Sequence, residues 1–172
     1  MARKVWVQGP IAIDSVVYLS QFPVPGSFMN SLRTEERTGG SSANVALGLC
    51  TASVETGFVC YLGKDDNGRK LRSILERSQI KDLVITEIDG PTSNALILVD
   101  NNSERTIISM TTPYLRQLRM DNVPLKAGEI VAFKQSLGQK GEIGKIMSQL
   151  LLFAPVVFFE DRLIDRVIPV HR

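Results

Sequence analysis

The sequence predicts a three-layer α/β domain with a mostly parallel sheet and a small lid made of β-ribbons. Short apolar runs alternate along the chain with segments that carry apolar residues at helical spacing, which is typical of α/β folds. The continuous apolar run at residues 156–159 is typical of a strand buried on both faces of a parallel sheet. No internal repeat or interior linker divides the chain, so we expect residues 1–172 to form a single domain.

The first segments of the chain are expected to be extended. Residues 4–7 and 11–19 are apolar on either side of Gly9-Pro10, which suits a first strand that runs into a turn. Residues 21–38 contain two prolines and a Pro25-Gly26 turn, so we expect a ribbon that leaves the core there.

A helix is expected over residues 42–52, with Ser41 or Ser42 as its N-cap. Three of its side chains share one face, namely Val45, Leu49 and Ala52. A glycine inside a helix costs about 1 kcal/mol relative to alanine. We therefore expect Gly48 to mark a close contact between this helix and the sheet that leaves no room for a side chain.

The remaining segments continue the alternation. Further strands are expected over residues 54–62, 83–88, 130–133 and 156–159, and further helices over residues 67–78 and 142–152. Residues 94–99 and 105–110 flank Asn101-Asn102, as the strands of a hairpin do. The lid is therefore expected to come from two excursions, at about residues 21–38 and 92–110.

Composition excludes several classes of function. The chain has 20 Lys+Arg against 18 Asp+Glu, a net charge of +2 and no block of like charge, which argues against a nucleic-acid or anionic-membrane partner. The single histidine is His171, and the two cysteines lack the spacing of a zinc site, so neither a histidine triad nor a structural zinc is expected. With no signal peptide and no apolar run of about 20 residues, the expected location is cytoplasmic.

Residues 39–68 carry the most informative pattern. Their order and spacing resemble the first signature of the ribokinase-like, or pfkB, family of carbohydrate kinases at Gly39, Gly40, Ser42, Asn44, Ala46, Ser53 and Gly63. Upstream, Asp14 and the segment at 22–26 are similar to the family's opening strand and lid. Downstream, residues 92–109 are similar to its second ribbon. The resemblance covers residues 4–110 and implies a partial ribokinase-like fold, corresponding to roughly the first half of a family member.

The resemblance implies a sugar-binding site at Asp14, Gly39, Gly40, Ser42 and Asn44. A glycine pair that enters a helix lets the backbone approach a ligand, and free N–H groups in the first helical turn donate to ligand oxygens. The Asn44 amide can both donate and accept, and the Asp14 carboxylate, at the end of the first strand, can accept from two adjacent hydroxyls. Without the similarity of the segments upstream and downstream, such a glycine-serine segment is more often only a helix cap and a turn.

Five residues need an interpretation of their own. Arg105 either reaches the phosphate of a phosphorylated sugar or is an ordinary solvated arginine. Asp65 and Asp66 are interpreted as an N-cap pair for the following helix and not as ligands. Ala12 stands where some sugar-specific members of the family have Asn, and Ser42 where most have Gly, Ala or Pro, which leaves the identity of the sugar open.

The family's second signature is absent from the sequence. Family members use ATP and Mg²⁺, and they take a base and an anion hole from a Gly-Ala-Gly-Asp type motif at a helix N-terminus. None of the nine aspartates follows a glycine, and the family's Asn-x-x-Glu motif is missing too. We therefore expect no catalytic residue, no ATP- or Mg²⁺-binding elements and no phosphotransferase activity from this chain alone.

Several functions stay open at this stage. The chain is expected to be the sugar-binding portion of a truncated or split carbohydrate kinase, or of a nucleoside-kinase-like member. The alternatives are a non-catalytic half-fold that senses a ligand or binds a partner, and a degraded gene. The expected partners are a sugar or sugar phosphate, together with a second copy or a complementing C-terminal half that covers the open edge of the sheet.

Overall fold

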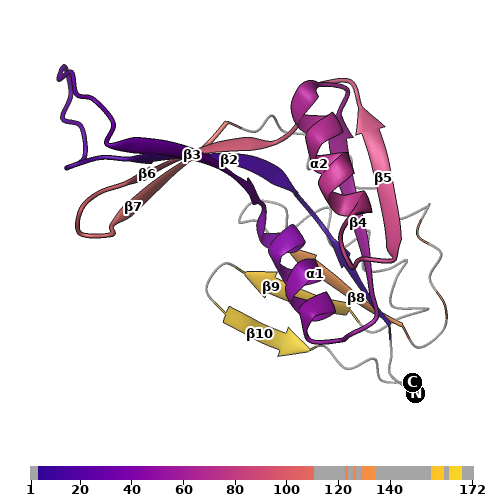
Figure 1. The fold of residues 1–172 in the computed structure, drawn as a ribbon. Coiled ribbons are helices and arrows are strands. Elements are labelled where there is room, and N and C mark those ends of the chain that lie inside the picture. The colour runs from indigo at the N-terminus through magenta and orange to yellow at the C-terminus, as the bar shows by residue number, and fades with distance from the viewer. Residues whose placement is uncertain are drawn as a thin grey trace.

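The computed structural model describes residues 4–110, 123, 126, 129–134, 156–160 and 163–167. From residue 130 onward, only the backbone of these residues is described. These residues form two sheets. The body sheet has six strands in the order β10-β9-β8-β1-β4-β5, and the lid sheet has four in the order β3-β2-β6-β7. Figure 1 shows the lid sheet extending away from the body. The helix expected at residues 142–152 lies outside the described residues.

The body sheet is mostly parallel, as the sequence predicts. Its central strand β1 (Val5–Gln8) lies between β4 (Thr56–Gly63) and β8 (Ile130–Lys134), and both pairings are parallel. The sheet continues in parallel through β5 (Asp82–Ile88) on one side and β9 (Val156–Glu160) on the other. Only β10 (Leu163–Val167), which the sequence patterns did not indicate, pairs in the antiparallel sense.

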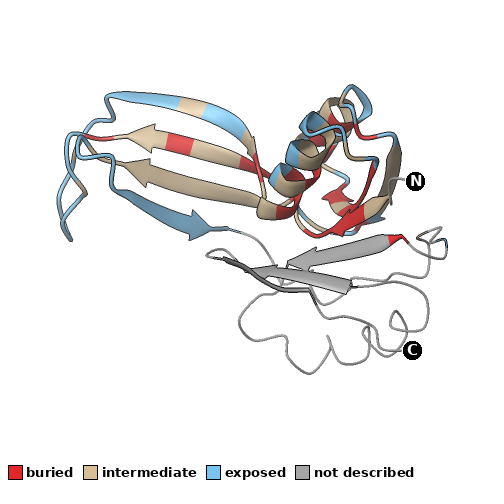
Figure 2. Ribbon diagram, turned by 90° about the horizontal axis from the view of Figure 1, so that it is seen from below, coloured by how far each residue is buried: buried red, intermediate tan, exposed pale blue. Residues whose placement is uncertain are grey.

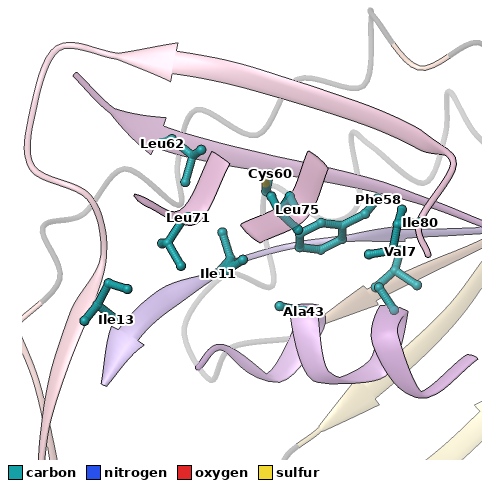
Figure 3. Packing of buried hydrophobic residues seen from close by; sticks show 11 residues of the cluster. Val7, Ile11, Ile13, Ala43, Phe58, Cys60, Leu62, Leu71, Leu75 and Ile80 are labelled. Atoms are coloured by element: carbon teal, nitrogen blue, oxygen red, sulfur yellow. The ribbon is translucent and has the colours of Figure 1, made fainter. Parts of the chain in front are cut away.

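Both described helices, α1 (Ser41–Thr51) and α2 (Asp66–Glu76), lie on one face of the body sheet (Figure 1). Between them and the sheet lies the core, in which Phe58 and Leu62 of β4 meet Leu71 and Leu75 of α2 (Figure 3). These apolar residues recur at helical spacing in α2 and at strand spacing in β4, which is why each element buries one face. Cys60 lies in this core, where burial raises the pKa of its thiol to about 12, so it is a small apolar residue as expected.

The two extended segments expected around Gly9-Pro10 are confirmed as β1 and β2 (Ala12–Tyr18). β2 leaves the body and pairs with β3 (Arg33–Gly39) and β6 (Asn94–Val99), so Asp14, expected at the end of the first strand, lies within the second strand instead. Gly9, whose φ is 149°, redirects the chain between the two sheets. The hairpin prediction is confirmed, since β6 pairs with β7 (Arg105–Ser109) in the antiparallel sense.

The lid carries the exposed apolar surface of the described part of the molecule. Every residue of β7 is exposed, and so are most residues of the loop between β2 and β3 (Figure 2). The large exposed apolar side chains all belong to the lid, its loop or the residue that follows β7: Val24, Phe28, Leu32, Ile107, Ile108 and Met110.

Trp6 anchors the face of the body sheet opposite the helices. It is 1% exposed, and its indole Nε1 donates to the Glu129 carboxylate at 2.9 Å. The ammonium of Lys4 lies 4.6 Å from the centre of the indole ring. Gly57 makes room for this ring, because a Cβ at that position would lie 2.4 Å from an indole carbon.

The expected N-cap of α1 is wrong. Gly40 occupies the N-cap position and no side chain caps the helix, while Ser42 lies inside the first turn and is fully buried. The buried residues of α1 are Ser42, Ala43 and Ala46. Because these side chains are small, the helix lies close to the sheet. Val45 and Leu49 pack at the margin of the core as expected, but Ala52 is exposed.

Gly48 does not mark a close contact, because it is exposed and a Cβ added there would meet no atom within 4 Å. Since the conformation is helical, we expect Gly48→Ala to raise the free energy of unfolding by about 0.5–1 kcal/mol, mainly by reducing the entropy of the unfolded chain. Urea denaturation followed by circular dichroism measures this. A lower free energy in the variant would show that position 48 is packed after all.

Within the part of the chain that the structure describes, no helix has both the length and the apolar character needed to cross a bilayer.

Candidate functional site

The candidate site lies where the lid sheet joins the first turn of α1. β3 ends at Gly39 and Gly40 caps α1, so these two elements are continuous in sequence, and Asp14 reaches the same place from the neighbouring strand β2. The junction follows the carboxyl end of β1, the edge at which open α/β sheets usually bind their ligands. The sequence predicted this grouping of Asp14 with the glycine pair.

The Asp14 carboxylate lies directly against Gly39. A Cβ at position 39 would be 1.9 Å from Asp14 Oδ2, so only glycine leaves the carboxylate in its place. Burial raises the pKa of Asp14 above its ordinary value. Among the described residues no hydrogen-bond donor offsets this burial: Arg37, directly across from Asp14 in the register, binds Glu35 instead. Within the described part of the chain, both oxygens of this carboxylate can therefore accept hydrogen bonds from a ligand.

Gly40 fixes the start of α1 against the turn between β1 and β2. Its φ is 100°, a conformation that L-residues with side chains rarely adopt. A Cβ there would lie 2.5 Å from the carbonyl oxygen of Pro10 and 2.8 Å from the Cα of Ile11. The helix begins in contact with backbone, so its N-terminus is held at the same junction as Asp14.

The first turn of α1 presents hydrogen-bond donors. No side chain caps it and no acidic residue lies in it, and the backbone N–H of Asn44 is the first to donate within the helix, to Gly40 at 3.0 Å. The N–H groups of residues 41–43 have no intrahelical acceptor, and the helix dipole adds positive potential there. Asn44 has an exposed side chain, whereas the hydroxyl of Ser42 is buried without a partner. Ser42 thus offers its backbone N–H and not its hydroxyl.

Arg105 lies on the same face of the lid as Asp14, but further out. Tyr18 of β2 aligns with Val99 of β6, which pairs with Arg105 of β7. Tyr18 lies four residues from Asp14 along β2, which corresponds to a distance of about 13 Å between Asp14 and the line of residues that contains Arg105. The structure therefore places Arg105 along one surface with the other candidate residues and not in direct contact with them.

The interpretation of Asp65 as an N-cap is confirmed, and the structure adds a second role. Asp65 Oδ1 accepts from the backbone N–H of Gly68 at 2.8 Å, and Oδ2 accepts from the backbone N–H of Thr92 at 2.9 Å. The Thr92 hydroxyl donates to Asp65 at 2.5 Å and accepts from the N–H of Gly63 at 2.9 Å. Asp65 therefore ties the start of α2 to the segment that enters lid strand β6. Asp66 only pairs with exposed Arg69.

A pocket of about 250 Å³ lies beside this cluster, at the ends of β4 and β5 and the first turns of α2. Three cations line it or reach its rim, but each is paired: Lys64 with Asp89, Arg69 with Asp66 and Arg72 with Glu87. The pocket is therefore close to neutral, and we assign it no ligand. In the described ranges, no three His, Cys, Asp or Glu residues come together as metal ligands would.

Comparison with known proteins gives a consistent result. Residues 2–151 match the family described as pfkB family carbohydrate kinase. The chain is 31% identical to a nucleoside kinase of Methanothermobacter thermautotrophicus over 58% of the chain and 33% of the relative, and 31% identical to a fructokinase of Salmonella typhimurium over 66% and 34%. The fold matches ribokinase from Giardia lamblia with a TM-score of 0.76 at 22% identity, covering 94% of this chain and 52% of that one. The chain thus spans about a third of these curated relatives and about half of the solved structure.

Proposed function

Because the chain belongs to the pfkB family of carbohydrate kinases, we propose that residues 1–172 supply the sugar-binding part of an enzyme that transfers the γ-phosphate of ATP to a sugar hydroxyl. The observation that carries this proposal is the Asp14 carboxylate, held against Gly39 beside the uncapped N-terminus of α1. We also propose that these residues form one partial domain with a lid. The proposed location is the cytoplasm, where the two free cysteines stay reduced.

The chemistry of the site suits a polyhydroxylated ligand. Two adjacent hydroxyls donate to the two oxygens of Asp14, and the N–H groups of the first turn of α1 donate to sugar oxygens. Gly39 and Gly40 leave the backbone bare, so the ligand can approach it closely. Asn44 adds a donor and an acceptor at the exposed side of the turn, and Ser42 adds its backbone N–H. Arg105 contributes only if the ligand extends along the lid.

We propose that the ATP and Mg²⁺ site is not supplied by these residues, because no aspartate in the sequence follows a glycine, as the family's catalytic aspartate does. The proposal is that residues 1–172 alone bind sugar and release no ADP, and that the base and the nucleotide site come from residues outside this sequence.

Calorimetry with ribose, fructose and adenosine tests the sugar site. We expect one of these ligands to bind, and Asp14→Asn to weaken its binding roughly tenfold, because hydrogen bonds to a charged group are worth about 1.5–3 kcal/mol. Gly39→Ala is expected to weaken binding in the same way, since its methyl group displaces the carboxylate. Glu76→Gln, an exposed carboxylate at the far end of α2, is the control. Equal binding by wild type and Asp14→Asn would contradict the proposal.

A second candidate is a non-catalytic half-fold that senses a ligand or binds a partner. The exposed strand β7 favours it, because β7 is the last strand of the lid sheet within the described residues and carries exposed apolar side chains, the kind of surface that a second copy or a complementing chain covers. ADP release in the presence of an added second half would support the split enzyme. Ligand binding with no ADP release in any mixture, together with a dimer by light scattering, would support the non-catalytic function.

A further inference from the structure

Gln8 is the last residue of β1, and its side-chain amide is buried without a hydrogen-bond partner. The residue is 1% exposed, and within the described part of the chain neither Oε1 nor Nε2 forms a hydrogen bond. The backbone is held on both sides, in line with Val59 of β4 and Phe133 of β8. Burying an amide without partners is costly, so the packing of the sheet alone does not account for a glutamine here.

Gln8 lies on the same side of the chain as Asp14. Val7 and Ile13 both belong to the core between the body sheet and the helices (Figure 3). Successive side chains of a strand point to opposite faces. Gln8 follows Val7 and Asp14 follows Ile13, so the amide and the carboxylate both lie on the side that faces away from this core.

The Asp14 carboxylate leans back toward the end of β1. A Cβ at Gly39 would lie 1.9 Å from Asp14 Oδ2, and Gly39 pairs with Ala12, which is two residues nearer to β1. The carboxylate therefore lies over this neighbouring pair and not over its own position in the strand. Ala12, on the same side of β2 as Asp14, carries only a methyl group, so it leaves room beside the carboxylate for a ligand.

The strand order of the body sheet reverses at β1. The chain adds β4 and β5 on one side of this strand and β8 and β9 on the other. In open α/β sheets, ligands bind outside the carboxyl ends of the strands at such a point. We propose that Gln8, which ends β1 there, is a further ligand-binding residue whose amide forms a hydrogen bond with one hydroxyl of the sugar. This inference rests on the proposed sugar site at Asp14.

The chemistry of the amide suits a sugar hydroxyl. Oε1 accepts and Nε2 donates, and a hydroxyl does both, whereas an ionised carboxylate such as that of Asp14 only accepts. The glutamine side chain has several rotatable bonds, so the amide can turn toward the carboxyl end of β1 while the backbone stays paired. Gln8 therefore distinguishes a sugar that carries this hydroxyl from one that lacks it, and the ligand supplies the partner that the fold does not.

Gln8→Met tests the contact, because methionine keeps the length of the side chain and removes its amide. Calorimetry of the full chain compares D-ribose, D-fructose and adenosine, each with its single-deoxy analogues. For the ligand that binds, we expect Gln8→Met to weaken binding roughly threefold to tenfold. One deoxy analogue is expected to bind wild type more weakly by a similar factor and to lose nothing further in Gln8→Met, as groups in direct contact do in a double-mutant cycle.

The same substitution is expected to raise the urea midpoint of unfolding, because an apolar group of similar shape replaces an unpaired buried amide. Thr56→Val is the matched control. Thr56 is 3% exposed at the amino end of β4, and its hydroxyl donates to the carbonyl of Val54 at 2.9 Å. Its loss is expected to lower the midpoint and to leave ligand affinity unchanged. A similar fall in the midpoint for Gln8→Met would show that the amide has a partner inside the fold and would overturn the inference.

The outcomes separate this inference from the proposed function. If Asp14→Asn weakens binding but Gln8→Met binds the ligand and every deoxy analogue as wild type does, the inference is overturned and the sugar site at Asp14 stands. Weakening of the ligand and of all its analogues by one common factor also overturns it, because no single hydroxyl is then the partner. If wild type binds none of the three ligands, both proposals are overturned. Circular dichroism confirms that each variant is folded.

Discussion

Replacing Gly40 with alanine is expected to lower the free energy of unfolding by about 3–5 kcal/mol. Two costs combine at this position. A φ of 100° strains any residue with a side chain, and the new methyl group would meet the carbonyl of Pro10 at 2.5 Å. Both obstacles are backbone, so neither can move aside without shifting the start of α1. A loss of this size is a large part of the stability of an ordinary domain.

Urea denaturation followed by circular dichroism measures the effect of Gly40→Ala, with two other glycines as comparisons. At Gly39 the methyl group conflicts with the carboxylate of Asp14, a side chain that can rotate, so we expect a smaller loss of stability there. At Gly48 we expect a gain. If Gly40→Ala were no more destabilising than Gly39→Ala, the described contact between α1 and the Pro10-Ile11 backbone would be incorrect.

Asp65→Ala is expected to lower the free energy of unfolding by about 2–4 kcal/mol, through loss of an N-cap and of hydrogen bonds to a charged group. The substitution frees the N–H of Gly68 and both the N–H and hydroxyl of Thr92. Thr92 is 3% exposed, so its groups cannot simply turn to water. Asp66→Ala is the matched control, because Asp66 is exposed and pairs only with Arg69.

The same substitution should change the response of stability to acid. Burial raises the pKa of Asp65, but hydrogen bonds from Thr92 and Gly68 lower it more, so the folded-state pKa lies below the ordinary 3.8. A depressed pKa contributes stability that is fully present above the unfolded value and is lost as pH falls through the folded value. We expect wild type to lose more stability than Asp65→Ala between neutral pH and strong acid. If the free energy of unfolding fell equally with pH in wild type and in Asp65→Ala, the Asp65 carboxylate would not be the group whose titration lowers stability.

Much of the fold can be predicted from the sequence because its signals are local. The charged and apolar residues of α2 alternate at helical spacing, and Asp65 stands where an N-cap belongs, so the helix and its start follow directly. The hairpin of β6 and β7 likewise follows from two apolar runs around Asn101-Asn102. The grouping of Asp14 with Gly39 was predicted from resemblance and not from spacing.

Other features depend on contacts that sequence spacing does not reveal. Thr92 and Asp65 form a hydrogen bond although they are 27 residues apart, and no sequence pattern around either residue indicates the other as its partner. Gly48 was misplaced because a helix rich in small residues has no clear apolar face, so its rotation against the sheet is set by Ala43 and Ala46.

Trp6 is the only tryptophan of the chain, and it is buried in the body sheet. Its fluorescence therefore reports on the polarity around β1 and on nothing in the lid, which contains no indole. Unfolding of the body exposes the ring and shifts its emission to longer wavelength, whereas a ligand that contacts only the lid leaves the spectrum of Trp6 unchanged. One intrinsic fluorophore thus separates loss of the fold from occupation of the surface beside Asp14, without any added label.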